Sequence, residues 1–565
     1  MKFRSCLIAA GLTLALVAPG SGPVSASDAS SGPTLDLNAS AMVDVGVIGD
    51  QPRTELELLQ QGREIESTLD WPAAISHYEK ATRSFPQSGP LYQALTINRL
   101  RADVDRRMND ASYLQAVKRL SLSQALDLYT EILANLQTHY VDPLDWSRVQ
   151  TFGTAALEIA LVEPQFVDRM MPGTDAASID ALHNSIHRSL SARNTSTRFD
   201  LRANVSFAAN LAERELGLAP GVTVMEFLAG AVSTLDTYTR LLSPQQLDDM
   251  FSNIYGNFVG LGVELETGDG FLNILSVIEG GPAQESGLVA GERIRSVDGV
   301  DGEVGGADRI ADLLRGPEDS TVRLIVRGFD GVEREITVPR RRIDVPCVEN
   351  DHFVDAESGI AYLRLTNFQT STPADVERKL WQLHRQNMRG LILDLRGNPG
   401  GLLSAAVDLA DRFLREGRIV TTKGRNVREN HQYVAHSPNT WNVPLAVLID
   451  GDSASASEIF AGAIADNRRG VIVGETSYGK GSVQGIFRMQ TAKFGLCLTT
   501  AKFFSPSGQA ISRRGVTPTL PVAKTYVAAR PTDTGRIATD AEDTVLQAAV
   551  ASLTRMPSTA ISQRP

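Results

Sequence analysis

Short apolar runs and helical patterns alternate along the last third of the chain. The runs at residues 390–395, 445–449 and 470–474 are bounded by glycine, proline or polar turn residues, which predicts buried strands. Between them, residues 402–414 and 454–466 are rich in helix-forming residues, with apolar positions at helical spacing. This alternation of strand and helix is typical of an α/β domain.

The chain before residue 255 has a helical pattern instead. Residues 55–107 carry small, aromatic and proline positions whose spacing resembles one tetratricopeptide-type helix pair, at Gly62, Trp71, Ala74, Tyr78, Ala81 and Pro86. One such pair cannot bury its own apolar face, so we expect it to pack on later helices or on a partner. A docking surface for an adaptor protein and a plain scaffold both fit this segment. Residues 121–250 continue as helices.

A run of serines follows the predicted strand at residues 445–449. Ser453, Ser455 and Ser457 alternate with alanine where this strand leads into the next helix. A hydroxyl at such a junction lies beside unpaired backbone N–H groups and the positive end of the helix dipole, and an oxyanion formed there would be stabilised. Serines before a helix commonly serve only as caps, and this interpretation stays open. Capping alone does not require three alternating serines, so the segment is a candidate nucleophile site.

The second candidate group is Lys480, which lies between Gly479 and Gly481 after the predicted strand at residues 470–474. A lysine acts as a general base near neutral pH only if its pKa is lowered, and burial in an apolar pocket does this. A solvated lysine in a surface loop is the alternative. Because the serine and lysine segments flank one helix and one strand, together they indicate a serine nucleophile with a lysine base.

Competing catalytic signatures find little support in the sequence. It contains no Gly-x-Ser-x-Gly, His-Glu-x-x-His or Cys-x-x-Cys motif. Ser477 and Lys480 fit the Ser-x-x-Lys pattern of penicillin-binding enzymes, but the glycines beside the lysine disfavour the helix that this pattern needs. His183 and His187 have helical i, i+4 spacing without an acidic or cysteine cluster beside them, so we expect no metal site. A Ser-His-Asp triad remains a minor alternative, through His384, His431 or His436.

Five blocks between residues 360 and 508 resemble, in order, those of the carboxyl-terminal processing peptidases, the tail-specific serine proteases of peptidase family S41. The blocks are Ile360–Phe368, Leu391–Leu403, Ser453–Glu458, Tyr478–Gln484 and Leu498–Gly508. In that family the nucleophile is the middle serine of Ser-Ala-Ser-Ala-Ser, and the lysine follows 25 residues later, as Lys480 follows Ser455 here. The resemblance therefore identifies these two residues as the catalytic pair.

The resemblance also assigns roles to neighbouring residues. It implies that Gln484, four positions after the lysine, is the third polar group of the site, where its amide could orient the lysine or a water. It implies an oxyanion hole formed by the backbone amide of Ala456 and by the turn of Gly400 and Gly401, with the donating glycine left open. The implied mechanism is attack of the serine hydroxyl on a peptide carbonyl, proton transfer to the lysine, and hydrolysis of an acyl-enzyme, without a metal or other cofactor.

Residues 255–343 resemble a PDZ domain. Gly260, Leu261, Gly262 and Val263 resemble the carboxylate-binding loop, whose backbone N–H groups can hold a terminal carboxylate while the bound peptide adds a strand. Leu261 and Val263 would line the pocket for the last apolar side chain. The resemblance therefore implies protein substrates with exposed, apolar C-terminal tails.

The first residues of the chain are typical of a secretory signal peptide. Lys2 and Arg4 precede the apolar run Leu7–Val17, and Val24–Ala26 forms a small-residue cleavage site before Ser27. We therefore expect export to the periplasm or the extracellular space, with peripheral membrane attachment left open. No other apolar stretch reaches the roughly 18 residues of a membrane span.

The composition narrows the class of partner and the state of the cysteines. A net charge of −11 and 6% aromatic residues argue against nucleic-acid binding. Cys347 and Cys497 could pair in an oxidising compartment or stay as buried free thiols. Assembly into an oligomer is also left open.

These patterns predict a multidomain α/β plus α protein: a crotonase/ClpP-like α/β protease core, a PDZ β-barrel-like domain inserted in or preceding it, and an N-terminal α-helical region with a TPR-like helix pair. The expected order is a signal peptide (1–26), a flexible leader (27–50), a TPR-like segment (51–120), a helical domain (121–254), a PDZ domain (255–343), an S41 peptidase core (344–522), and a C-terminal linker and helix (523–565). The expected function is that of an exported serine endopeptidase that binds protein C-termini through its PDZ domain and cleaves the bound protein. The alternative is a catalytically silent PDZ and helical scaffold that binds protein tails.

Overall fold

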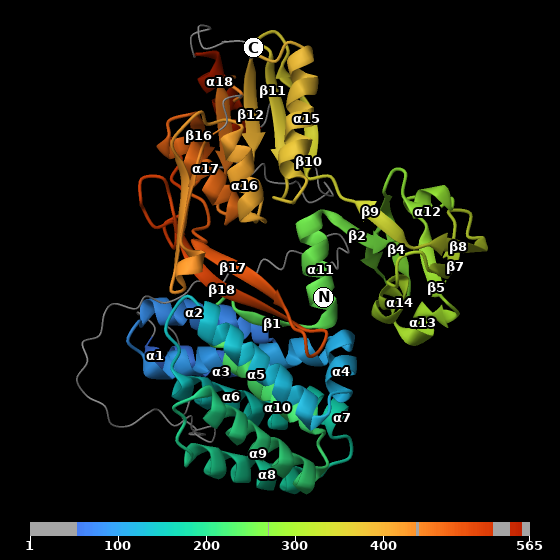
Figure 1. The fold of residues 1–565 in the computed structure, drawn as a ribbon. Helices are drawn as coiled ribbons and strands as arrows, with labels where there is room; N and C mark the ends of the chain where they lie inside the picture. Colours follow the sequence, from blue (N-terminus) through green and yellow to red (C-terminus); the bar gives the residue numbers. More distant parts are fainter. Residues whose placement is uncertain (1–53, 269, 437–439, 524–542, 556–565) are drawn as a thin grey trace.

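The computed structural model describes residues 54–268, 270–436, 440–523 and 543–555. Figure 1 shows a helical part (blue to green), an α/β part (yellow to red), and a smaller β-rich part to one side of both. This arrangement confirms the predicted multidomain α/β plus α architecture. The predicted signal peptide and leader, and most of the predicted C-terminal linker, lie outside the described residues.

The helical part is built around α10, which is buried along nearly its whole length. Its buried carboxylate, Glu226, accepts hydrogen bonds from Arg107 (2.6 Å) and from the hydroxyl of Tyr113 (2.9 Å), so that α3 and α4 are fixed to it. Its helices are α1 (Glu55–Glu66), α2 (Trp71–Ser84), α3 (Gly89–Met108), α4 (Ala111–Lys118), α5 (Leu122–His139), α6 (Trp146–Val162), α7 (Pro164–Met170), α8 (Ala176–Ser191), α9 (Arg198–Leu216) and α10 (Pro220–Ser233).

The TPR-like helices pack on a later helix, as the sequence predicts. Leu100 of α3 is buried against Ala155, Ala156 and Ile159 of α6. Part of the apolar face that one helix pair leaves open is therefore covered within the same chain.

A six-stranded sheet forms the centre of the α/β part, in the order β10-β11-β12-β15-β16-β19. Its strands run parallel except for β10, and they are β10 (Val348–Asp355), β11 (Ile360–Leu365), β12 (Gly390–Asp394), β15 (Leu445–Ile449), β16 (Val471–Gly474) and β19 (Leu520–Pro521). Leu391 and Leu393 of β12 pack against α15 (Thr372–Arg385), α16 (Leu403–Asp411) and α17 (Ala456–Asp466). Ile392 packs on the other face, which α18 (Thr544–Thr554) covers. This alternation follows from the pleat of the strand.

A second sheet connects the α/β part to the helices. It consists of β1 (Arg240–Leu242), β18 (Gly495–Phe504), β13 (Arg418–Gly424) and β14 (His431–Val434), with β17 (Ser482–Arg488) paired to β18; η1 (Val427–Glu429) precedes β14. The short strand β1 leaves the helical part and pairs with β18, which places Arg240 opposite Cys497. Phe494, Leu496 and Leu498 belong to the same buried cluster as the core helices α5 and α10. The hairpin of β17 and β18 therefore packs into the core of the helical part, while the six-stranded sheet has buried clusters of its own.

The β-rich part is reached through α11 (Pro244–Tyr255) and a ribbon of two strands, β2 (Asn257–Gly260) and β9 (Arg341–Asp344). Its own sheet has the order β3-β4-β5-β7-β8, so that β3 lies at an edge. The elements are β3 (Val263–Thr267), β4 (Leu272–Val277), α12 (Pro282–Glu285), β5 (Arg293–Val297), β6 (Val300–Asp301), α13 (Gly302–Gly305), α14 (Ala307–Leu314), β7 (Thr321–Arg327) and β8 (Glu333–Pro339).

Candidate active site

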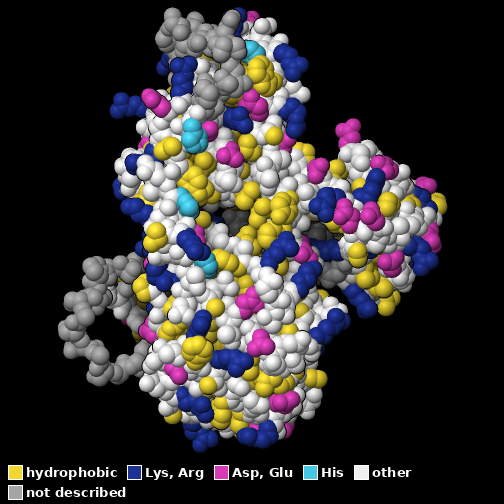
Figure 2. Space-filling view, viewed as in Figure 1, with side chains coloured by type: hydrophobic (Ala, Val, Ile, Leu, Met, Phe, Trp, Pro, Cys, Tyr) yellow, Lys and Arg dark blue, Asp and Glu magenta, His cyan; other side chains and the backbone are white. Residues whose placement is uncertain are grey.

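One large cavity of about 2800 Å³ lies where the three parts of the molecule meet. Figure 2 shows the surface hollowed at this place. Ser455, Lys480 and Gln484 line the cavity together with Gly400 and Gly401. The structure thus brings together residues that lie far apart in the sequence, as predicted for one site.

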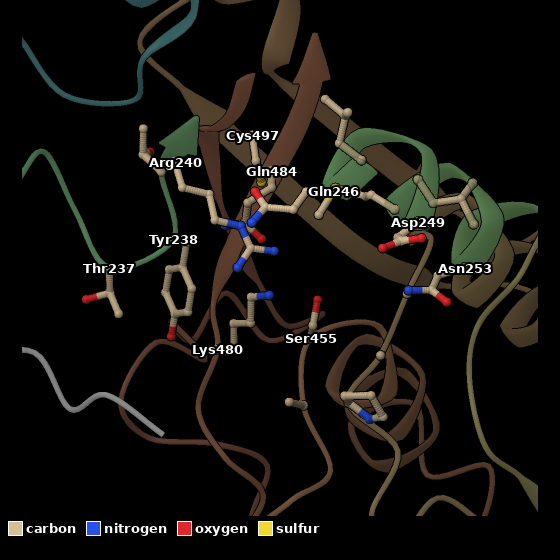
Figure 3. Close-up of a pocket in the computed structure, with 18 of the residues that line it drawn as sticks. Thr237, Tyr238, Arg240, Gln246, Asp249, Asn253, Ser455, Lys480, Gln484 and Cys497 are labelled. Atoms are coloured by element: carbon tan, nitrogen blue, oxygen red, sulfur yellow. The ribbon is translucent and has the colours of Figure 1, made fainter. Parts of the chain in front are cut away.

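Ser455 lies at the start of α17 in a backbone conformation that L residues rarely adopt, with φ 57° and ψ −112°. Such a conformation persists only where its surroundings hold it. The neighbouring turn is tied down by the hydroxyl of Ser453, which donates to the carbonyl of Leu395 (2.8 Å), and by the hydroxyl of Ser457, which donates to the carbonyl of Asn398 (3.0 Å). These two serines therefore fasten the start of the helix, while the hydroxyl of Ser455 points into the cavity (Figure 3). The sequence did not predict this conformation.

Lys480 lies in the non-helical loop between β16 and β17, with its amine directed toward Ser455 (Figure 3). Its Nζ is 4.9 Å from the centre of the Tyr238 ring. Burial lowers the pKa of this amine, and a lowered pKa is what a lysine needs to act as a general base near neutral pH. The loop conformation also removes the penicillin-binding alternative, which needs a helix at this position.

A buried carboxylate, Glu458, joins the serine and lysine segments. It accepts hydrogen bonds from the backbone N–H groups of Ser455 (2.8 Å) and Lys480 (2.9 Å). It also accepts from the N–H of Gly479 (2.6 Å) and from the hydroxyl of Ser477 (2.6 Å). Burial raises the pKa of Glu458, and these donors oppose the increase. The spacing of Ser455 and Glu458 is that of a capping box, but nothing in the sequence indicated that the same carboxylate reaches the lysine loop.

The turn of Gly400 and Gly401 lies directly against the start of α17. A Cβ atom on Gly400 would come within 2.8 Å of the Ser455 Cβ and 2.9 Å of the Ala456 nitrogen, so glycine keeps this space open. The N–H of Gly400 donates to Asn398 Oδ1 (2.9 Å). For the N–H of Gly401, no acceptor is found among the residues that the structure describes.

Gln484 lines the same cavity but does not bond to the lysine. Its amide NH₂ donates to the hydroxyl of Ser482 (2.9 Å), and the pairing of β17 with β18 shifts register between Val483 and Gln484. The simple alternation that would place positions 480, 482 and 484 on one face is therefore interrupted. The role of Gln484 stays a prediction.

The PDZ-like loop opens into the same cavity as the catalytic candidates. Gly260, Leu261, Gly262 and Val263 all line it, and Gly262 has a positive φ of 81°. The side chains of Leu261 and Val263 are buried in the core of the β-rich part. The edge strand β3 begins at Val263, so its free edge starts directly after the loop.

The histidines and one of the two described cysteines lie outside the catalytic cavity. His187 is 2.9 Å from the carboxylate of Glu158, an acidic neighbour from another helix that the sequence spacing had not shown. Even so, no group of three or more residues suited to a metal ion is found in the described part of the chain. Cys347 and Cys497 are both free and buried, so the disulfide alternative is excluded. Of the two, Cys497 lines the catalytic cavity.

His384, His431 and His436 are absent from the lining of the cavity. His384 packs against the rings of Trp381 and Trp441. His436 lies 3.5 Å from Asp411. A triad through these histidines has no geometric support.

Comparison with known proteins shows which protein families the chain resembles. Residues 359–522 match the model of peptidase family S41, and residues 274–328 match the model of the PDZ domain. The carboxy-terminal-processing protease of Bartonella bacilliformis is 36% identical over 302 residues, which cover 52% of this chain and 68% of that protein. The carboxyl-terminal-processing protease of a Synechocystis species is 36% identical over 295 residues, which cover 51% of this chain and 68% of that protein. Among solved structures, the photosystem II D1 C-terminal processing protease is 25% identical, covers 67% of this chain and 94% of its own, and has a TM-score of 0.34.

The fold and the relatives define a serine peptidase that carries a PDZ domain. The chain belongs to peptidase family S41, among the carboxyl-terminal-processing proteases. None of the helices in the described ranges combines the length and apolarity that a bilayer crossing requires.

Proposed function

We propose that this protein is an exported endopeptidase in which Ser455 is the nucleophile and Lys480 the general base, and in which the PDZ domain binds the C-termini of substrate proteins. The observation that carries the proposal is the carboxylate of Glu458, which accepts hydrogen bonds from the backbone N–H groups of both catalytic candidates. A buried acceptor shared in this way fixes the two segments relative to each other. Export rests on the pattern of the first 26 residues, which lie outside the described ranges.

In the proposed reaction the Ser455 hydroxyl attacks the carbonyl carbon of the scissile peptide bond and gives its proton to the neutral amine of Lys480. The backbone N–H groups of Ala456 and Gly401 stabilise the oxyanion of the tetrahedral intermediate. Gly401 is preferred over Gly400, whose N–H already donates to Asn398. The protonated lysine then gives its proton to the leaving amine, and water hydrolyses the acyl-enzyme.

Tail recognition is proposed at the edge strand β3 and its preceding loop. A bound tail adds to β3 as a further strand, with its carboxylate at the N–H groups of the loop. Leu265 and Leu314 line the cavity beside Leu261 and Val263, which favours an apolar last residue. This groove and the catalytic pair line one cavity, which supports binding and cleavage of the same substrate chain there. The docking of an adaptor on the helices and the oligomeric state stay predictions.

The test is hydrolysis of an unstructured protein with an apolar C-terminus by the full chain. Ser455→Ala and Lys480→Ala are each expected to lower kcat by about 10³-fold or more, because they remove the nucleophile and its base. Lys379→Ala, which removes a lysine paired with Asp351 outside the cavity, is the matched control and should cleave like the wild type. Wild-type rates in both variants would show that the assignment of the catalytic pair is wrong, and no hydrolysis by the wild type itself would favour the silent scaffold.

A further inference from the structure

The turn between α10 and β1 reaches the active site although it lies outside the residues that match the peptidase model. Asp236 holds this turn, since its carboxylate accepts from the N–H groups of Tyr238 (2.7 Å) and Thr239 (2.9 Å) and from the Thr239 hydroxyl (2.6 Å). It also accepts from the hydroxyl of Thr499 on β18 (3.0 Å), and the N–H of Thr499 donates to the Thr239 hydroxyl (3.1 Å). The turn and the peptidase sheet are therefore fixed to each other.

This fixed turn and the first residue of β1 bring two side chains to the lysine. The Tyr238 ring centre is 4.9 Å from Lys480 Nζ. Arg240 is paired with Cys497 across β1 and β18, and Figure 3 shows its guanidinium between Gln484 and the lysine amine. Arg240 lines the same cavity as the catalytic candidates. Two basic groups thus share one part of the cavity.

Arg240 lacks the acidic partner that three other arginines of the cavity have. Arg99, Arg106 and Arg315 form ion pairs with acidic side chains. For Arg240, neither an ion pair nor a side-chain hydrogen bond is found among the residues that the structure describes. Its positive charge is therefore not neutralised by a direct contact with an acidic group in the described part of the protein.

The titratable groups around Lys480 come from four neighbouring segments: Arg240 from β1, Tyr238 from the turn before it, Glu458 from α17 and Cys497 from β18. Burial raises the pKa of the Cys497 thiol, so the thiol is neutral near neutral pH. Burial raises the pKa of the Tyr238 hydroxyl as well, which keeps it uncharged. Glu458 favours a protonated lysine, and among these groups only Arg240 opposes it by charge.

We propose that Arg240 is a positioning residue of the peptidase reaction: its unpaired positive charge disfavours a proton on Lys480 and keeps the amine able to accept the proton of Ser455. The inference rests on the proposed catalytic pair. The direction agrees with the pKa of Lys480, which is lowered first by burial and further by Arg240. A lysine with a lowered pKa also returns its proton more readily to the leaving amine.

The first test is the pH dependence of kcat/KM for the wild type, Arg240→Gln and Arg240→Lys, measured on a fluorogenic peptide with an apolar C-terminal residue. Removing the positive charge raises the pKa of Lys480, so the amine stays protonated to higher pH. The acid limb of the Arg240→Gln profile should therefore move up by about 0.5 to 1 pH unit, a loss of about 3- to 10-fold in rate below the limb. Arg240→Lys keeps the charge and should keep the limb near its wild-type position. A purely structural role would lower the plateau in Arg240→Gln and leave the limb in place, which would overturn the proposal.

A second test does not depend on hydrolysis. In full-length Ser455→Ala protein, acetylation of Lys480 by acetic anhydride is followed across pH by mass spectrometry, with and without Arg240→Gln. The pH of half-maximal labelling should rise with Arg240→Gln by the same amount as the acid limb, in protein whose circular dichroism matches that of the parent. Unshifted labelling overturns the role of Arg240 and leaves the catalytic pair intact. Hydrolysis retained by Ser455→Ala overturns the catalytic pair itself, whatever the labelling shows.

Discussion

Glu458 is the residue on which the geometry of the site depends. Its carboxylate is completely buried and accepts hydrogen bonds from the backbone N–H groups of both Ser455 and Lys480. A glutamine at this position would offer a single acceptor oxygen. Its NH₂ group would face hydrogen-bond donors that the carboxylate now accepts from. A change at this position therefore alters the relative placement of Ser455 and Lys480 without removing either of them.

Glu458→Gln is expected to lower kcat by about 10²-fold or more while KM changes little, because the misplaced groups act in the chemical step. It should also lower the free energy of unfolding by about 1 to 3 kcal/mol, since buried donors lose their acceptor. Steady-state kinetics and urea unfolding measure the two effects. Glu213→Gln, at an exposed position on α9, is the control for the change of charge. Equal kcat values in Glu458→Gln and the control would contradict the role of the carboxylate.

At this scale the sequence predicted the residues that a spacing rule can identify. Ser455 and Lys480 were predicted because their separation is a property of the chain alone. The sequence assigned no role to Glu458, because its contact with the lysine loop depends on how β16 and β17 return past α17. The positive φ of Ser455 and the approach of Arg240 likewise come from tertiary packing, which local patterns do not encode.

The elements of the peptidase core were predicted well, for a physical reason. Strands buried on both faces, such as β12 and β15, are nearly continuous apolar runs between turn residues, and they are visible in the sequence. The pairing of β1 with β18 was not predicted, since β1 has only three residues and its partner lies far along the chain. That pairing is what brings the turn of Tyr238 and Arg240 to the active site.

The edge strand β3 is the element that tail recognition requires, and the terminal carboxylate tests it. In the Ser455→Ala protein, a peptide with an apolar C-terminal residue should bind at least about 10-fold more weakly when its carboxylate is replaced by a carboxamide, because the charge-assisted hydrogen bonds to the loop are lost. Fluorescence anisotropy of a labelled peptide measures both affinities. Acetylating the N-terminus of the same peptide is the control and should leave the affinity unchanged. Equal affinities for the acid and the amide would contradict a C-terminus reader.

At the scale of the whole molecule, a hairpin of the peptidase core is buried in the cluster of the helical part, although the central sheet has clusters of its own. The hairpin of β17 and β18 contributes Phe494, Leu496 and Leu498 to the cluster that contains the core of α5 and α10. Glu131 of α5 also accepts from backbone N–H groups at the tip of this hairpin, at Gln490 (2.7 Å) and Thr491 (3.1 Å). Unfolding either part would expose apolar surface of the other, so we expect the two parts to unfold together.

The four tryptophans allow this to be measured, because Trp71 and Trp146 lie in the helical part while Trp381 and Trp441 lie in the core. Replacing either pair by phenylalanine leaves fluorescence reporters in one part only. The two double variants are expected to give the same urea midpoint. Phe494→Ala, which removes a buried ring from the shared cluster, should lower the free energy of unfolding by about 3 to 5 kcal/mol and shift both midpoints together. A shift confined to one reporter would show that the parts fold independently, and the turn that carries Arg240 would then join the active site only after both have folded.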